Sequence, residues 1–502
     1  MKIRDMIVAN RADCSGCEAC ANICPKNAIE MIRYGEGFAY PTINPKLCIK
    51  CGRCDATCPA LNFKKKIPTA LPATFAAICT DDKIRRHSSS GGIFSALSEI
   101  ILQNGGVVFG AAFDKNWRVI HTSARNFDEL ENLRGSKYVQ SKIGNVYRQV
   151  RYALNSKPVL FSGTPCQCAG LKHFLGSDPD NLLTVEIICH GTPSPMIWEN
   201  YIDTIGYAHD IKHVNFRSKR TGWKNYQFEI NFSDQVCKTN ELVKDFYGKL
   251  FLRGVSERPS CSACKFKIPN GQADLTIGDA WGVEDFAPKM FDDGGTSIIF
   301  VHTEKGKDFF KQAKLVAQPV SFIEATKKNP RSLIQSAADS RRKNFFADFI
   351  KNADKFAVIE KYYYQDDRKF SKETSQKNQL AYKKILQDIL SQIRQQFEKN
   401  ILVVVNPVED MQKKFEKFFE QNFKNCGIYF LSPDKNEQLI CKETFSSLTF
   451  NFKDGEELSN FAKEFNLSNV YAENPLNWRV NFFLEWLKGS GLPLQTFSLK
   501  SN

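Results

Sequence analysis

Apolar residues in the middle of the chain follow two different spacings. Between positions 93 and 103 they recur at 93, 97, 100 and 101, which is the spacing of one helix face, and two glycines follow. Short runs rich in β-branched and aromatic residues predict strands at Thr74–Cys79, Val107–Phe113, Lys157–Phe161, Leu183–Cys189, Phe216–Phe232 and Asp274–Gly278. Strands that alternate with helices predict an α/β fold.

This α/β body is expected to occupy residues 73–357, and further segments flank it. Residues 1–62 are rich in cysteine and predict an α+β ferredoxin-like module, with short strands at 29–33 and 38–40. Residues 64–72 combine three lysines with two prolines, which is typical of a linker.

The last third of the chain is expected to form a separate part. Residues 371–399 predict a helical linker, and residues 400–502 a small α/β domain of unknown role. Its expected strands lie at 401–405, 428–431 and 470–472, and its expected helices at 411–423, 456–465 and 482–488. The fold class is therefore α/β, with an α+β ferredoxin-like module in front.

Eight cysteines within residues 14–58 form two copies of one pattern, C-x-x-C-x-x-C-x-x-x-C-P. Three thiolates at this spacing can wrap one corner of an iron–sulfur cube, and the fourth ligates the other cube in two-cluster ferredoxins. One predicted [4Fe–4S] cluster is therefore held by Cys14, Cys17, Cys20 and Cys58, and the second by Cys48, Cys51, Cys54 and Cys24. Zinc is the alternative, but its sites rarely repeat three equally spaced cysteines before Cys-Pro.

Two polar segments of the body lie at expected strand ends, where ligands bind in open α/β sheets. Residues 85–92 (RRHSSSGG) precede a helix, whose free N–H groups would suit a phosphate or pyrophosphate; an ordinary serine N-cap is the alternative. Residues 162–170 place Cys166 at the mouth of a helix, where a stabilised thiolate would serve as a nucleophile or a ligand.

Four cysteines of the body predict a third [4Fe–4S] cluster. Cys166 and Cys189 follow expected strands, and Cys261 and Cys264 form a C-x-x-C pair. A zinc site or separate buried thiols are the alternatives, and Cys168 can replace Cys166 as the ligand.

Composition and charge restrict the class of protein. The 502 residues are 42% hydrophobic, and no apolar run reaches the roughly 20 residues that a membrane span needs. Without a secretory signal pattern at the start, a cytoplasmic location is expected. The net charge of +14 favours an acidic electron-transfer protein or partner subunit; no motif indicates nucleic acid, and no G-x-G-x-x-G follows a strand.

The body resembles the coenzyme F-420 hydrogenase/dehydrogenase beta subunit family over about residues 73–324. The resemblance rests on SGG at 90–92, GSKYVQS at 135–141, GTPCQ at 163–167, CHG at 189–191, FRSK at 216–219, GW at 222–223, C-x-x-C at 261–264 and IGDAWG at 277–282. It implies an FAD-binding α/β domain that also holds an iron–sulfur cluster. Residues that the resemblance places around the flavin are Ser89, Ser90, Gly91, Gly92, Lys137, Tyr138, Gly163, Thr164, Pro165, Gln167 and Asp279, with Trp281 in the same cleft.

The predicted function is that of an iron–sulfur flavoprotein oxidoreductase. Clusters carry single electrons, and FAD would convert them into pairs for an organic substrate such as coenzyme F-420 or a related small molecule. Lys137 would stabilise negative charge near the flavin, or form a surface salt bridge; His190 would move a proton, or be structural. The alternative function is a non-catalytic electron-transfer subunit that docks on a larger oxidoreductase.

Overall fold

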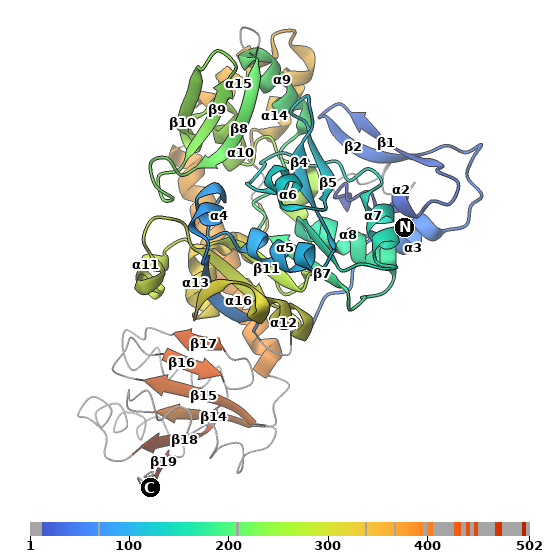
Figure 1. Cartoon of the computed structure of the whole chain (residues 1–502). Helices are drawn as coiled ribbons and strands as arrows, with labels where there is room; N and C mark the ends of the chain where they lie inside the picture. Colours follow the sequence, from blue (N-terminus) through green and yellow to red (C-terminus); the bar gives the residue numbers. More distant parts are fainter. Residues whose placement is uncertain are drawn as a thin grey trace.

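An eight-stranded mixed sheet lies at the centre of the molecule (Figure 1). The computed structural model describes residues 13–68, 71–206, 210–336, 339–365 and 368–394, and six strands beyond them. The sheet order is β13-β3-β12-β11-β7-β6-β4-β5. The strands are β3 (Ala73–Cys79), β4 (Val107–Phe113), β5 (Val119–Ala124), β6 (Val159–Gly163), β7 (Leu182–Ile187), β11 (Leu275–Asp279), β12 (Ser297–Val301) and β13 (Leu315–Pro319).

The middle of this sheet is parallel, which explains the continuous apolar runs of the sequence. Strand β6 pairs in parallel with β4 and with β7, and β7 pairs in parallel with β11. All five residues of β6 are buried, as expected for a strand covered on both faces. Since parallel strands end at the same edge, the segments after β6, β7 and β11 converge there.

Helices cover both faces of the sheet. On one face, α5 (Ile93–Gln103) and α12 (Glu304–Gln312) pack into the core that contains Leu97 and Leu183. On the other face, α7 (Val146–Ala153) and α8 (Pro165–Leu175) contribute to the core that contains Phe161 and Phe174. Short helices α4 (Asp82–His87), α6 (Phe127–Leu133), α11 (Val283–Phe286) and α13 (Phe322–Lys328) complete this part.

A second, three-stranded antiparallel sheet stands beside the first (Figure 1). The strand structure predicted within residues 216–232 is present but divided: β8 (Ile211–Ser218) and β9 (Gln227–Phe232) form a hairpin around Gly222, whose φ is 98°. Its other elements are β10 (Cys237–Glu241), α9 (Pro195–Ile205), α10 (Phe246–Leu252), α14 (Arg342–Lys351) and α15 (Lys355–Tyr363). Aromatic residues dominate their shared core.

The N-terminal module consists of the hairpin β1 (Ile29–Tyr34) and β2 (Phe38–Ile43) and the short helices α2 (Ala19–Ile23) and α3 (Arg53–Thr57). Its two cysteine loops share one backbone shape. Gly16 and Lys50 are equivalent positions with φ of 70° and 56°, and Glu18 and Gly52 are equivalent with φ of 63° and 71°. The sequence repeat is therefore also a structural repeat.

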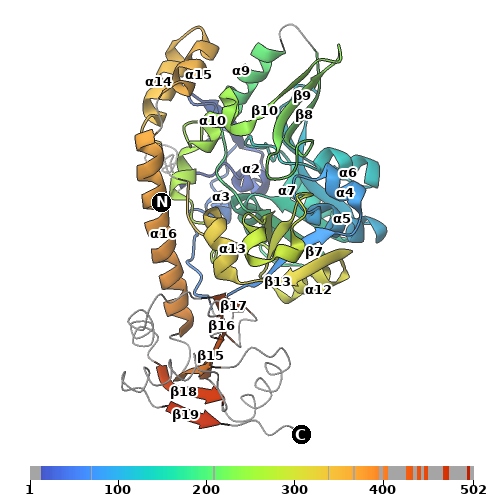
Figure 2. The same ribbon diagram turned by 90° about the vertical axis from the view of Figure 1, so that its left-hand side faces the viewer.

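The C-terminal part begins with helix α16 (Arg368–Arg394), which runs along one side of the molecule (Figure 2). A six-stranded sheet follows, with β14 (Lys399–Val404), β15 (Cys426–Ser432), β16 (Gln438–Cys441), β17 (Ser446–Thr449), β18 (Leu467–Glu473) and β19 (Leu494–Phe497). The strands predicted in this region are present. The helices predicted at 411–423, 456–465 and 482–488 lie outside the described residues. No helix within the described ranges has the length and apolar character needed to cross a membrane.

Candidate functional site

Four cysteines of the N-terminal module surround one internal cavity. Cys14, Cys17, Cys20 and Cys58 all line it, so the last cysteine of the second motif lies with the first three of the first motif. Burial raises the pKa of Cys17 and Cys20, and the neighbouring thiols add to this effect. This is the crossed grouping predicted for the first cluster.

The other four cysteines of the module lie nearer to the surface. Cys51 is exposed, whereas Cys24, Cys48 and Cys54 are half-buried. Cys24 and Cys54 pack beside one small apolar cluster, and Cys48 is close enough to Cys54 to raise its pKa. The structure thus separates a buried set and a surface set within one module.

A third set of cysteines lines a cavity where the body meets the module. Cys166, Cys189, Cys261 and Cys264 border it, together with Asp13 of the module. Burial, followed by the neighbouring Cys264, raises the pKa of Cys166 to about 12, so the free thiol is protonated rather than the stabilised thiolate expected from its position at a helix start.

Cys168 points elsewhere. It is fully buried, and its Sγ lies 3.9 Å from the carbonyl oxygen of Val185 in the core beneath α8. The placement favours Cys166 over Cys168 as the ligand.

The first and third sets, which line cavities, suit clusters better than single ions. Within the described residues, no group of three or more Cys, His, Asp or Glu side chains is arranged to hold one metal ion. Zinc requires four ligands converging at about 2.0–2.3 Å from one point. Thiols that surround a void without converging are the arrangement that a cube of iron and sulfur needs.

A large cavity of about 500 Å³ lies at the carboxyl edge of the sheet. Its lining brings together motif segments that are far apart in the sequence, including residues 88–90, 133–141, 162–164, 166–167, 187–192, 277–279 and 281. Of the residues predicted around a flavin, Ser89, Ser90, Gly92, Lys137, Tyr138, Gly163, Thr164, Gln167 and Asp279 border it. The cavity is therefore the common site of the predicted flavin residues.

Gly91 and Pro165 are the two exceptions, and both have structural reasons. A Cβ at Gly91 would lie 2.5 Å from the carbonyl oxygen of Ala77 and 2.8 Å from the nitrogen of Ser297, so glycine is needed where strands β3 and β12 pass. Pro165 is the first residue of α8 and borders the third cysteine set instead. The prediction that these two contact the flavin is not supported by their placement.

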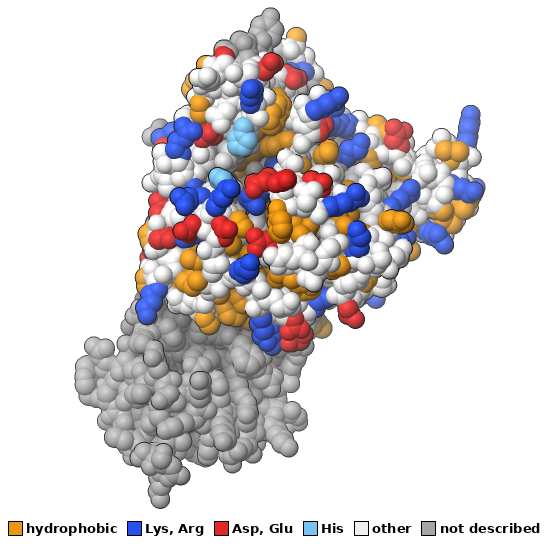
Figure 3. Space-filling model, viewed as in Figure 1, with side chains coloured by type: hydrophobic (Ala, Val, Ile, Leu, Met, Phe, Trp, Pro, Cys, Tyr) orange, Lys and Arg blue, Asp and Glu red, His pale blue; other side chains and the backbone are white. Residues whose placement is uncertain are grey.

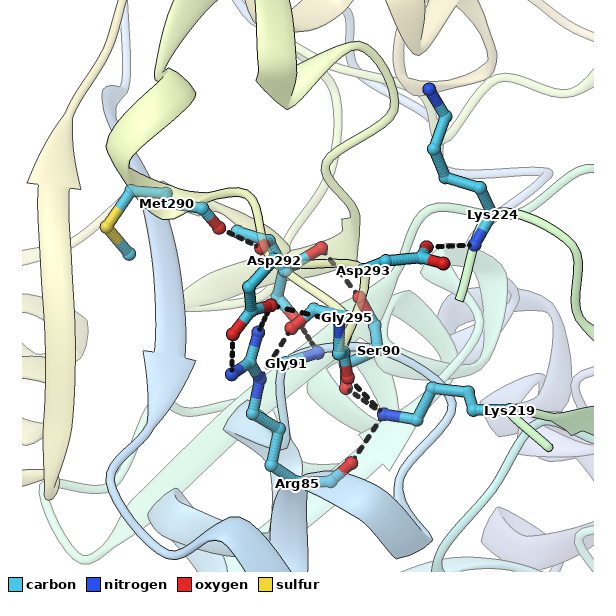
Figure 4. Close-up of polar contacts among 12 residues, drawn as sticks. Arg85, Ser90, Gly91, Lys219, Lys224, Met290, Asp292, Asp293 and Gly295 are labelled. Carbon is cyan, nitrogen blue, oxygen red and sulfur yellow. Dashed lines mark hydrogen bonds and ion pairs between the residues drawn. The ribbon is translucent and has the colours of Figure 1, made fainter. Parts of the chain in front are cut away.

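The serine-rich loop before α5 is held in place from behind (Figure 4). Arg85, at the start of this segment, pairs with Asp292 and donates to the Gly295 carbonyl at 2.9 Å. The ammonium group of Lys219 donates to three backbone carbonyls, those of Arg85, Ser90 and Gly294, at 2.5, 3.0 and 2.8 Å. These contacts fix the loop, and its serines remain at the cavity wall.

Lys137 lies on the wall of the large cavity, not in a surface salt bridge. Its Nζ donates to the carbonyl oxygens of Asn132, Arg134 and Gly135 at 3.1, 2.8 and 3.2 Å. Burial lowers the pKa of Lys137 to about 7, and the three carbonyls oppose this because they favour the charged form. An amine that gains or loses its proton near neutral pH thus lies beside the cavity.

An aromatic wall with a buried ion pair closes another side of the cavity. Arg217 is 3% exposed and forms two hydrogen bonds with Asp279, at 2.7 and 2.9 Å. Its guanidinium lies 3.9 Å from the ring centre of Tyr226, and Trp223 donates to Asp279 at 2.9 Å. Trp281 stacks on Trp223 at 4.8 Å. Such a surface suits a planar, electron-rich ligand.

His121 is a cavity residue that our sequence reasoning missed. Its Nε2 lies 3.0 Å from the carbonyl oxygen of Ser162, which can only accept, so Nε2 carries the proton. Its Nδ1 then accepts from Ser141, which in turn accepts from Gln167 at 2.9 Å. Burial lowers the pKa of His121 to about 4, so the ring is neutral. A histidine within a strand gives no sequence signal that its side chain lines a ligand cavity.

His190 borders both the large cavity and the cavity of the third cysteine set. Its Nε2 lies 3.3 Å from the carbonyl oxygen of Leu252, and its ring meets Phe251 edge-on at 5.2 Å. These contacts support the structural alternative and leave the ring at the boundary between the two cavities.

The three cavities are neighbours. Ser15, which follows Cys14, borders all of them, and Cys166 and Cys189 border both the third-set cavity and the large cavity. Arg258 links the first and third cysteine sets. It lies three residues before Cys261, is 2% exposed, and donates a hydrogen bond to the carbonyl oxygen of Cys14 at 2.7 Å.

These features define an α/β iron–sulfur protein with a fused ferredoxin-like module and a ligand cavity at the edge of its sheet. Comparisons with known proteins agree. Residues 13–62 match the 4Fe-4S dicluster domain, residues 74–148 match the N-terminal part of the coenzyme F420 hydrogenase/dehydrogenase beta subunit, and residues 156–325 match its C-terminal part. The body of the chain thus matches the coenzyme F420 hydrogenase/dehydrogenase beta subunit family, with a ferredoxin-type dicluster domain in front of it.

Individual relatives are more distant. An uncharacterized polyferredoxin-like protein of Methanocaldococcus jannaschii is 37% identical over 67 residues, which are 12% of this chain and 40% of that protein. The chain thus spans less than half the length of this curated relative. A chain in the structure of the F420-reducing [NiFe] hydrogenase complex from Methanosarcina barkeri matches 58% of this chain and 97% of its own length, with 16% identity and a TM-score of 0.39.

Proposed function

We propose that the chain is an iron–sulfur flavoprotein oxidoreductase that relays electrons between ferredoxin-type clusters and a two-electron organic substrate by way of FAD. The observation that carries this proposal is the sequence of adjoining cavities, in which Ser15 borders all three and Cys166 borders two. When bound, clusters supply single-electron transfer, and a flavin supplies the exchange between single electrons and pairs.

The residues at each cavity suit the group assigned to it. The three cysteine sets supply four thiols each. The large cavity offers serine hydroxyls beside the N-terminus of α5, which favours phosphate groups. Lys137 supplies a cationic group on its wall, where a ring that gains electrons would be stabilised, while the charge of Arg217 is balanced by Asp279.

The family description supports coenzyme F-420 or a related small molecule as the organic substrate. A second protein would exchange electrons at the module, and the net charge of +14 favours an acidic one. The direction of electron flow depends on the relative potentials of these two partners.

The experiment is anaerobic purification followed by iron, sulfide and flavin analysis, with spectra before and after dithionite. About twelve irons and one FAD per chain are expected, together with turnover of coenzyme F-420 by artificial electron donors. About eight irons would remove the third cluster from the proposal. A chain without flavin and without turnover would instead be a non-catalytic electron-transfer subunit.

A further inference from the structure

Two cysteines of the surface set, Cys48 and Cys51, lie in a loop that exposes apolar side chains. The loop over residues 44–52 connects β2 to α3 and carries Cys51, which is exposed. Leu47 and Ile49 beside it are 51% and 57% exposed. Two large aliphatic side chains therefore face solvent next to a predicted cluster ligand.

Positive charge surrounds these apolar side chains. Lys46, Lys50 and Arg53 are exposed, and none of them forms an ion pair with another described residue. Arg53 also lies near Arg151, whose pKa is lowered by burial and by the neighbouring charges of Arg148 and Arg53. Basic side chains that are not balanced by carboxylates repel one another, so an anionic partner that covers this surface would stabilise it.

The neighbouring sequence offers little to neutralise them. Across residues 44–57, Asp55 is the single carboxylate, and it is half-buried. Figure 3 shows basic and apolar side chains together on the N-terminal module, at the right edge of the molecule. The other two cysteine sets lie in internal cavities, so this loop is the exposed approach to the predicted clusters.

We infer that Lys46, Leu47, Ile49, Lys50 and Arg53 form the docking face for an acidic electron-carrier protein. The inference rests on the proposed function, and it adds where the carrier binds and what surface it needs: carboxylates around an apolar rim at its own redox centre. A face of this kind supports a small, short-lived contact that is steered by charge and sensitive to salt.

The experiment uses the full chain with its clusters and a purified acidic [4Fe–4S] ferredoxin as the probe. The face variant carries K46E, K50E and R53E. The matched control carries K212E, K289E and K311E, three exposed lysines on other elements, and therefore has the same net charge. Binding at several salt concentrations, and the rate of electron exchange with reduced ferredoxin, are measured for both variants.

The expected result is that the face variant loses about tenfold or more of the association rate at low salt, with a weaker salt dependence, while the control keeps most of it. Equal losses in both variants would mean that charge attracts the carrier without a defined site. A face variant that binds normally, or an unaltered chain that does not bind the ferredoxin, would also overturn the inference.

The proposed function is checked separately in the same samples. Dithionite is a small donor that needs no docking face, so iron content and dithionite reduction should be equal in all three chains. An unaltered chain that contains no clusters or no flavin would count against the proposed function. If dithionite reduces the face variant normally but ferredoxin does not, the defect lies in docking and not in electron transfer within the chain.

Discussion

Replacing Gly16 with alanine tests how tightly the module is locked to the body, and Gly52 provides the control. Both glycines lie in cysteine loops, with φ of 70° and 71°. Alanine at this φ costs about 1 kcal/mol in either loop because its Cβ crowds the backbone. Around Gly52 nothing lies within 4 Å of the new Cβ, so the backbone term should be the whole cost there.

At Gly16 the same Cβ would lie 2.7 Å from Nη1 of Arg258 and 2.7 Å from Nε2 of Gln140. Arg258 cannot turn away freely, since it donates to the carbonyls of Cys14 and Ala39 at 2.7 and 3.0 Å. Losing one such hydrogen bond from a charged group costs about 1.5–3 kcal/mol. The expected total for G16A is therefore about 3 kcal/mol, against about 1 kcal/mol for G52A.

Anaerobic thermal unfolding of the cluster-loaded chain measures the difference. A gap of about 2 kcal/mol corresponds to a melting temperature about 4–8 °C lower for G16A than for G52A. Adding G16A to an R258A chain should cost less than adding it to the unaltered chain, because one of the two overlapping side chains is gone while Gln140 remains. Equal melting temperatures for the two single variants, or an equal cost of G16A with and without Arg258, would refute the reasoning.

Three further predictions concern single side chains. The pKa of His121 falls from 6.5 to about 4 on folding, so the unfolded chain takes up a proton at a higher pH than the folded chain. The free energy of unfolding should therefore drop as the pH falls from about 6.5 to 4. H121Q should make this pH dependence weaker when unfolding is measured at several pH values. K219M removes the donor shared by three carbonyls and should cost about 2–4 kcal/mol, seen in thermal unfolding, with weaker flavin retention. C166S should lower the iron content by about four per chain, whereas C168S should leave it unchanged.

The parts of the site that could be predicted from sequence are those with a local cause. Cysteine spacing determines the shape of each loop, so the crossed grouping of Cys58 with the first motif followed from ferredoxin geometry. Strand ends also have a local signature, and the convergence of Cys166 and Cys189 followed because parallel strands end at one edge.

The features of the site that the sequence could not predict are those that depend on which distant segments pack against one another. Nothing near Ser15 indicates that it also borders the large cavity, and nothing near Arg258 indicates that it bonds to the Cys14 loop, because these contacts join segments 125 and 244 residues apart. Gly91 shows the reverse error: glycine beside serines indicated a ligand loop, but the close approach is to strands β3 and β12. The meaning of a small residue depends on what is packed against it.

The segment predicted as a linker between the module and the body is fixed in place by hydrogen bonds, as is the module itself. Residues 64–72 have the composition of a flexible connection, yet Lys66 is pinned through its backbone to Asn270 at 2.9 Å. The carboxylate of Glu18 is 7% exposed and accepts from the backbone nitrogens of Ile143 and Gly144, both at 3.0 Å.

A module joined to the body by a flexible linker alone would make none of these contacts. Burial raises the pKa of Glu18, which shows that placing its carboxylate at this boundary is energetically unfavourable unless the contacts compensate for it. Asn22 and Arg148 add further bonds across the same boundary, at 2.8 and 2.6 Å. The distance between the first and third cysteine sets is therefore held by the fold, whereas Cys51 of the second set is exposed.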